Sequence, residues 1–161
     1  MQEIERKFLV KKLPDLSKNE CISYERYFLK IESDFEERIQ KKGDNYELER
    51  KVNKSDLSRK TEKKEMSKKD FDTLKKSAVS KSIIRDSYNI SGNSTITIKI
   101  YHGDYEGLVR AEVDFFSEEE AKNFQPYDWM GKEITNTQLG KDSKLIQLTR
   151  KKFKDLLDSL K

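Results

Sequence analysis

Residues 2–10 read QEIERKFLV, a stretch in which charged and apolar residues alternate. Successive side chains of a β-strand point to opposite faces, so Glu3, Glu5 and Lys7 share one face while Ile4, Phe8 and Val10 share the other. Two neighbouring carboxylates repel each other unless a cation lies between them, and a divalent metal ion with oxygen ligands would serve. A solvent-facing edge strand of mixed charge explains the same pattern, so this stretch alone leaves both interpretations open.

The composition favours one folded domain over residues 1–161. A chain of this length buries roughly two thirds of the surface that it exposes when unfolded. Charged residues make up 40% of the chain and the mean hydropathy is -0.97, but the 10% of aromatic residues and the recurring apolar alternation indicate a packed core. The net charge of +4 is a weak bias toward anionic partners.

Cysteine and histidine are too scarce for several classes of site. The chain has one cysteine, Cys21, and one histidine, His102, which excludes a disulfide within the chain and gives no convincing material for a zinc cluster or a cysteine-histidine pair. We therefore expect chemistry that runs on carboxylates, Lys, Arg and a hard cation. No run of about 18 apolar residues occurs, and the charged opening strand does not resemble a leader, so the sequence predicts a cytoplasmic protein without a membrane partner.

Alternating patterns predict about seven or eight strands, with turns at 91–93 and 102–104. Ser67 and Ser117 each resemble a helix N-cap, which predicts short helices reaching Leu74 and Phe124. The apolar spacing over residues 143–160 predicts one C-terminal helix that docks on the sheet. Residues 129–135 read as a loop or a short strand. The expected strands are 3–10, 21–31, 35–41, 46–52, 59–66, 83–90, 95–101 and 108–115.

Several of these strands repeat the charged face of the first, and Glu112 and Asp114 form a second pair of carboxylates two residues apart. Either an open sheet exposes this face to water, or the sheet closes with its charged faces inward. A barrel of about eight strands can hold one small ligand. A dry lumen of unpaired charges would be costly, whereas a hydrated lumen with a metal ion and a polyanion would not. Composition does not choose between the two architectures.

The opening residues resemble the N-terminal signature of the CYTH superfamily, the triphosphate tunnel metalloenzymes, whose hallmark is Glu-x-Glu-x-Lys. Glu3, Glu5 and Lys7 supply this motif. Later residues follow in the family's order, so the resemblance spans nearly the whole chain. They are Arg38, Lys51, Arg59, Arg85, Glu112, Asp114 and the block Gly131-Lys132-Glu133-Ile134-Thr135.

The resemblance implies a mainly antiparallel α+β fold: a closed, tunnel-like barrel of eight strands with a charged lumen, covered by a few helices including the C-terminal one. It also implies hydrolysis of a triphosphate with Mg2+ or Mn2+ as cofactor. Carboxylates suit hard cations, and Arg and Lys suit phosphate. The implied metal ligands are Glu3, Glu5, Glu112 and Asp114. The implied catalytic residues are Glu5, Glu112 and Asp114, the implied phosphate-binding residues are Lys7, Arg38, Lys51, Arg59 and Arg85, and Glu133 is a further candidate.

The sequence departs from the family pattern at several positions that would face the lumen. On the strand at 59–66, Thr61 and Lys63 stand where two Glu are usual, while Glu62 and Glu65 are out of phase. Such a slip turns carboxylates to the opposite face unless a β-bulge corrects it. The other departures are Gln40, Ser87, Lys99, Thr137, Leu139 and Gly140.

These departures leave three functions open. The first is metal-dependent hydrolysis of inorganic triphosphate or a related short polyphosphate. The second is a sibling activity: hydrolysis of thiamine triphosphate or a nucleoside triphosphate, or cyclisation of ATP. The third is non-catalytic binding of phosphorylated ligands, if the tunnel has lost turnover.

The expected partner is a small molecule that contains a triphosphate. Lysine doublets such as Lys68-Lys69 and Lys151-Lys152 are interspersed with Glu and Asp, and no nucleic-acid recognition motif accompanies them, so we expect no nucleic-acid partner. A homodimer is compatible with an open-ended barrel, although no stretch of the sequence identifies an interface.

Overall fold

The computed structural model describes residues 2–90 and 93–161, so part of the turn predicted at 91–93 lies outside the described residues. The strands found there match the predicted ones to within one or two residues at each end. They are β1 Gln2–Val10, β2 Cys21–Ile31, β3 Phe35–Lys42, β4 Asn45–Asn53, β5 Ser58–Met66, β6 Ile83–Ile90, β7 Asn93–His102, β8 Val109–Asp114 and β9 Met130–Glu133.

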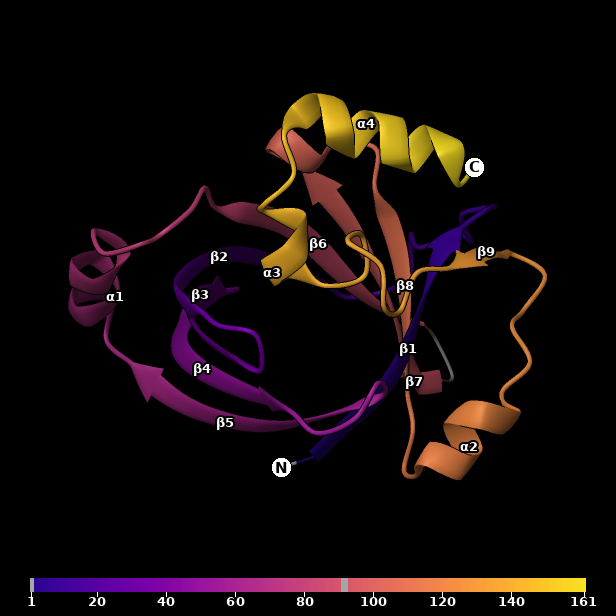
Figure 1. Cartoon of the computed structure of the whole chain (residues 1–161), viewed down its shortest axis with the longest axis horizontal. Coiled ribbons are helices and arrows are strands. Elements are labelled where there is room, and N and C mark those ends of the chain that lie inside the picture. Colours follow the sequence, from indigo (N-terminus) through magenta and orange to yellow (C-terminus); the bar gives the residue numbers. More distant parts are fainter. Residues whose placement is uncertain (1, 91–92) are drawn as a thin grey trace.

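All described strand pairs are antiparallel, and the sheet order is β5-β4-β3-β2-β6-β7-β8-β1-β9. An additional pairing of β5 with β1 closes β1 to β8 into a barrel and leaves β9 as an extra strand beside β1 (Figure 1). At this seam Glu3 lies directly opposite Arg59. The expected α+β fold with a closed barrel of eight strands is therefore confirmed.

The described residues include four α-helices, which lie around the barrel (Figure 1). They are α1 Lys68–Lys75, α2 Glu118–Asn123, α3 Asp142–Leu145 and α4 Arg150–Ser159. The predicted N-caps are confirmed, because the hydroxyls of Ser67 and Ser117 accept hydrogen bonds from the amides of Asp70 and Glu120 at 3.0 and 3.1 Å. In the described part of the chain, no helix is both long and apolar enough to cross a membrane.

The prediction of one continuous helix over residues 143–160 is wrong. The chain leaves the helical conformation after α3, and Thr149 adopts an extended backbone with ψ at 158°. Its hydroxyl accepts a hydrogen bond from the Lys152 amide at 3.2 Å and so starts a separate helix, α4. A capping threonine accepts a hydrogen bond from an amide of the first helical turn. It therefore starts a new helix here, although the apolar spacing of the segment is uninterrupted.

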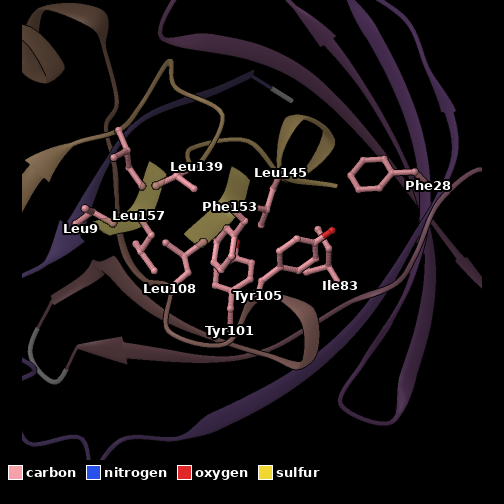
Figure 2. Close-up of a cluster of buried hydrophobic side chains, with 11 residues drawn as sticks. Leu9, Phe28, Ile83, Tyr101, Tyr105, Leu108, Leu139, Leu145, Phe153 and Leu157 are labelled. Carbon is pink, nitrogen blue, oxygen red and sulfur yellow. The ribbon is translucent and has the colours of Figure 1, made fainter. Parts of the chain in front are cut away.

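Apolar side chains form one buried cluster at an end of the barrel and another on its outer face. Phe28, Ile83 and Tyr101 from the strands meet Leu145 of α3 and Phe153 of α4 in a buried cluster (Figure 2). A second cluster, which includes residues 8, 96, 111, 113 and 130, lies on the outer face of β1, β7 and β8. Because the apolar side chains pack there, the barrel interior is left to polar and charged side chains.

Candidate active site

A cavity of about 270 Å³ lies inside the barrel and is lined by residues from β1 to β8 and by Asp142 of α3. Ten Lys and Arg side chains and seven Asp and Glu side chains line it, so cations are in excess. Nine of the ten residues singled out from the sequence belong to this lining. They are Glu3, Glu5, Lys7, Arg38, Lys51, Arg59, Arg85, Glu112 and Asp114.

The pairing of β1 with β8 brings the two predicted pairs of carboxylates together. Glu5 lies directly opposite Asp114, and Lys7 lies opposite Glu112. Side chains of directly paired residues point to the same face of a sheet, so the acidic residues of both strands share one wall of the cavity. Sequence alternation predicted each pair, and the strand register joins them.

Glu5 and Asp114 divide their protons unequally. Burial alone would raise the pKa of Glu5, but the Lys7 ammonium, 3.3 Å away, lowers it to about 2. Desolvation, followed by the negative charges of Glu5 and Glu112 and a hydrogen bond with Glu5, raises the pKa of Asp114 to about 7. At neutral pH the Asp114 carboxyl, at the exposed end of β8, therefore keeps a proton part of the time.

Carboxylates pair with the cations of the lumen. The Lys51 ammonium lies 2.5 Å from Glu3, and the Lys99 ammonium lies 2.9 Å from Glu112. Burial lowers the pKa of Lys51 to about 8 and that of Lys99 to about 7, in each case helped by neighbouring arginines. The lumen is thus a network of internal ion pairs in which Lys51 and Lys99 lose protons more readily than an exposed lysine does. Other pairs are Arg59 with Glu36 at 2.5 Å, Arg38 with Glu49 at 3.4 Å and Arg110 with Glu112 at 2.7 Å.

The centre of this network is Asp142, which sequence reasoning missed. Its carboxylate oxygens lie 2.7 Å from Arg26 and 3.2 Å from both Arg85 and Arg110, and one accepts a hydrogen bond from the Tyr101 hydroxyl at 2.7 Å. Although burial opposes ionisation, the three guanidinium groups keep the pKa of Asp142 well below its usual range. Asp142 therefore fastens α3 to the wall of the cavity.

A signal for Arg110 was present in the sequence, because Arg110 alternates with Glu112 and Asp114 on one strand face. Arg26 likewise sits within a predicted strand. No comparable pattern marked Asp142. It precedes a segment whose apolar spacing predicted a helix that docks on the sheet. Only the tertiary fold turns it inward.

The substituted positions take part in the same network. Gln40 accepts hydrogen bonds from two nitrogens of Arg26, at 2.8 and 2.5 Å, and the Lys63 ammonium lies 3.7 Å from Glu49. The pairing of β4 with β5 runs without a bulge, so Glu62 lies opposite Arg50 and Thr61 lies opposite Lys51. No bulge in this described stretch restores the missing carboxylates.

Gly140 stands where the family pattern has a side chain. A Cβ atom at this position would lie 2.0 Å from the Ile134 carbonyl oxygen, so the close approach of two chain segments requires glycine. The Gly140 carbonyl in turn accepts a hydrogen bond from the Lys7 ammonium at 2.8 Å. This departure serves the packing of the 134–142 segment against β1.

The structure does not bring Glu133 to the cavity. Its carboxylate pairs with the Arg6 guanidinium at 2.7 Å on the outer side of β1, and it accepts a hydrogen bond from Thr135. The Thr135 hydroxyl also accepts a hydrogen bond from the Lys7 amide at 3.0 Å. The block 131–135 therefore supports β1 from outside, because β9 adds to the barrel as an extra strand.

The carboxylates fit a divalent cation in chemistry, but only two of them are already together. In the described part of the chain, no group of three or more His, Cys, Asp or Glu side chains is arranged to hold a metal ion. A divalent cation could replace the proton that Asp114 holds beside Glu5, and carboxylate oxygens are the ligands such cations prefer. A third ligand would require Glu3 to leave Lys51, or Glu112 to give up its contact with Lys99 or Arg110.

Comparisons of the sequence and of the fold with known proteins both find an inorganic triphosphatase. The sequence is 26% identical over 147 residues to an inorganic triphosphatase from Nitrosomonas europaea, covering 90% of this chain and 97% of that protein. The fold resembles the crystal structure of the inorganic triphosphatase NE1496, with a TM-score of 0.67 and 24% identity over 91% of this chain and 95% of that one. It also resembles a conserved hypothetical protein from Pyrococcus furiosus, with a TM-score of 0.51 and 20% identity over 74% of this chain and 83% of that one. No family model matches the chain.

Replacement of Asp142 tests the network. Asp142→Asn removes the negative charge that three arginines share, and breaking a buried ion pair from one side costs about 3–5 kcal/mol. We expect the free energy of unfolding, measured by urea denaturation, to fall by about that amount. Asp158→Asn, on the exposed face of α4, is the matched control and should change little. A loss as small as the control's would show that Asp142 does not hold the wall together.

The raised pKa of Asp114 beside Glu5 predicts how this carboxyl titrates. In the presence of chelator, the Asp114 carboxyl should titrate by NMR with a midpoint near 7, and Glu5→Gln should lower that midpoint because a negative neighbour is removed. Since the pKa of Asp114 is higher in the folded than in the unfolded chain, this group makes folding less favourable as pH rises from about 4 to 7. A wild-type midpoint near the ordinary aspartate value would refute the description of the pair.

Proposed function

We propose that this chain, whose resemblance to the CYTH superfamily holds in both sequence and fold, hydrolyses inorganic triphosphate or a related short-chain triphosphate with the help of a divalent cation. The observation that carries the proposal is the register of β1 against β8, which joins Glu5 to Asp114 beside a cavity with an excess of Lys and Arg. A closed barrel with that lining suits a compact polyanion. The curated relative named an inorganic triphosphatase supports the same substrate class.

Substrate binding would exchange partners within the lumen. Phosphate oxygens would replace carboxylates as partners of Lys51, Arg59 and Arg38, with the guanidinium groups taking paired oxygens and the lysine acting as a point charge. Freed carboxylates would then need a new counter-ion. Because a metal ion supplies one, we infer that triphosphate and metal bind together more tightly than either binds alone.

Mg2+ or Mn2+ is the cofactor we propose. Glu5 and Asp114 would hold it, joined by Glu3 or Glu112 once that residue leaves its lysine. When bound, such a cation neutralises charge on phosphate oxygens and polarises the phosphoryl group. Its ligands must be deprotonated, so metal affinity should rise as pH passes the raised pKa of Asp114.

Hydrolysis needs no covalent intermediate with the protein. A water oxygen forms a bond to the terminal phosphorus while the bond from that phosphorus to the bridging oxygen breaks, and pyrophosphate leaves. The carboxylates of the Glu5 and Asp114 wall would orient the water and accept its proton, and Lys7 and Arg59 would balance the charge that moves to the leaving group.

Non-catalytic binding of phosphorylated ligands is the second candidate. The observation that favours it is the loss of lumen carboxylates on β5 and β7, where Lys63 and Lys99 pair with Glu49 and Glu112. Each lysine pairs with a carboxylate whose oxygens could otherwise bind a metal ion or a water molecule.

A phosphate-release assay separates these candidates. With Mg2+ or Mn2+, we expect release from inorganic triphosphate, and chelator should abolish it; ATP and thiamine triphosphate in parallel test the sibling activities. Glu5→Gln should lower turnover by at least about a hundred-fold, since it removes a carboxylate of the reacting wall. Glu62→Gln, the same substitution on an exposed outer position of β5, should retain wild-type turnover.

Two outcomes would contradict the proposal. If triphosphate raises the melting temperature but no substrate releases phosphate under any metal condition, the chain is a binder. If Glu5→Gln turns over as fast as Glu62→Gln, the wall formed by β1 and β8 is not the active site.

A further inference from the structure

A second cavity, of about 320 Å³, lies next to the lumen and is called here the vestibule. Residues 31–36, which link β2 to β3, form one side of it, and Lys141, Ser143 and Lys144 at α3 form another. Lys51 and Arg59 line both the vestibule and the lumen. The two cavities therefore adjoin at these two side chains.

Two cations of the vestibule differ from those of the lumen. No ion pair in the described part of the chain involves Lys141 or Lys144, whereas Lys51, Arg59 and Lys99 each have a carboxylate partner. Lys141 is half-buried, and this burial together with the charges of Arg59 and Lys144 lowers its pKa. A cation among other cations, without a carboxylate of its own, is suited to an external anion.

In the described part of the chain, no acidic side chain of the vestibule forms an ion pair with Lys141 or Lys144, although Glu36 attracts Lys141 electrostatically. Glu36 is engaged by Arg59 at 2.5 Å, and Glu32 lies 3.3 Å from Lys30. Asp34 is the remaining carboxylate of the lining. The vestibule thus keeps a surplus of positive charge on the side formed by α3.

The same helix has one face toward each cavity. Asp142 points into the lumen, where its ion pairs with arginines hold it, while its neighbours Lys141, Ser143 and Lys144 line the vestibule. Because the Asp142 anchor is almost fully buried, it fixes the position from which the two lysines project. The lysines are therefore presented by a rigid support and not by a free loop.

We propose that the vestibule is a second phosphate subsite, in which Lys141 and Lys144 bind the tail of a linear polyphosphate longer than three phosphates while its terminal phosphates occupy the lumen. This inference rests on the proposed function and extends its substrate class. Lys51 and Arg59 would contact the chain where it passes from one cavity to the other. Triphosphate itself would fill the lumen and leave the vestibule lysines unused.

The test compares inorganic triphosphate with a size-fractionated linear polyphosphate. For each ligand, affinity is measured by calorimetry and kcat/KM by phosphate release, in wild type and in the double variant Lys141→Ala with Lys144→Ala. Charge-assisted hydrogen bonds contribute enough that we expect the variant to lose at least about ten-fold in affinity and kcat/KM for the polyphosphate. Both quantities for triphosphate should stay within about two-fold. Lys151→Ala with Lys152→Ala, on exposed α4, is the matched control.

The outcomes are distinguishable. Equal losses for both ligands would place the lysines in the triphosphate site, and no loss for either would leave the vestibule without a role; each result overturns the subsite. If wild type binds polyphosphate no more tightly than triphosphate, the subsite is likewise refuted. If no ligand is hydrolysed but the variant still loses polyphosphate affinity selectively, the proposed function fails and the subsite stands.

Discussion

The structure depends on the mutual neutralisation of charges inside a closed barrel. Moving a carboxylate or an ammonium out of water costs several kcal/mol, which only well-placed partners can offset. The register of the strands supplies those partners, as where Glu3 faces Arg59 across the seam and Lys7 faces Glu112 across the acidic wall. The strand pairings that close the barrel therefore also bring the residues of the site together.

This arrangement places stability and function in different parts of the molecule. Apolar burial lies outside the lumen, in a cluster around Phe153 of α4 (Figure 2) and in a second cluster around Phe8. Inside, under the proposed function, the ion pairs would change partners while that core stays intact. Asp142 links the two regions, because it belongs to the helix that carries Leu145 into the apolar cluster and yet faces three arginines of the lumen.

The closed barrel followed from the family resemblance, because alternation alone left an open sheet possible. Alternation along the strands was sufficient to predict the lumen positions, since a side chain's face on a strand follows from its parity. Sequence patterns failed at positions whose place depends on tertiary contacts. Glu133 matched a family motif but lies outside, because β9 adds to β1 as an extra strand. The C-terminal apolar spacing concealed the break before Thr149, and Asp142 gained its role only from a fold that brings Arg26 and Arg110 around it.

The most direct measurement of the central claim, that carboxylates and cations of the lumen exchange internal partners for metal and phosphate, is a calorimetric titration of inorganic triphosphate with and without Mg2+. The claim predicts that Mg2+ increases triphosphate affinity, and that triphosphate increases Mg2+ affinity by the same factor, because coupling between two ligands is reciprocal. Manganese should act in the same direction. Triphosphate affinity that is unchanged by chelator would contradict the claim.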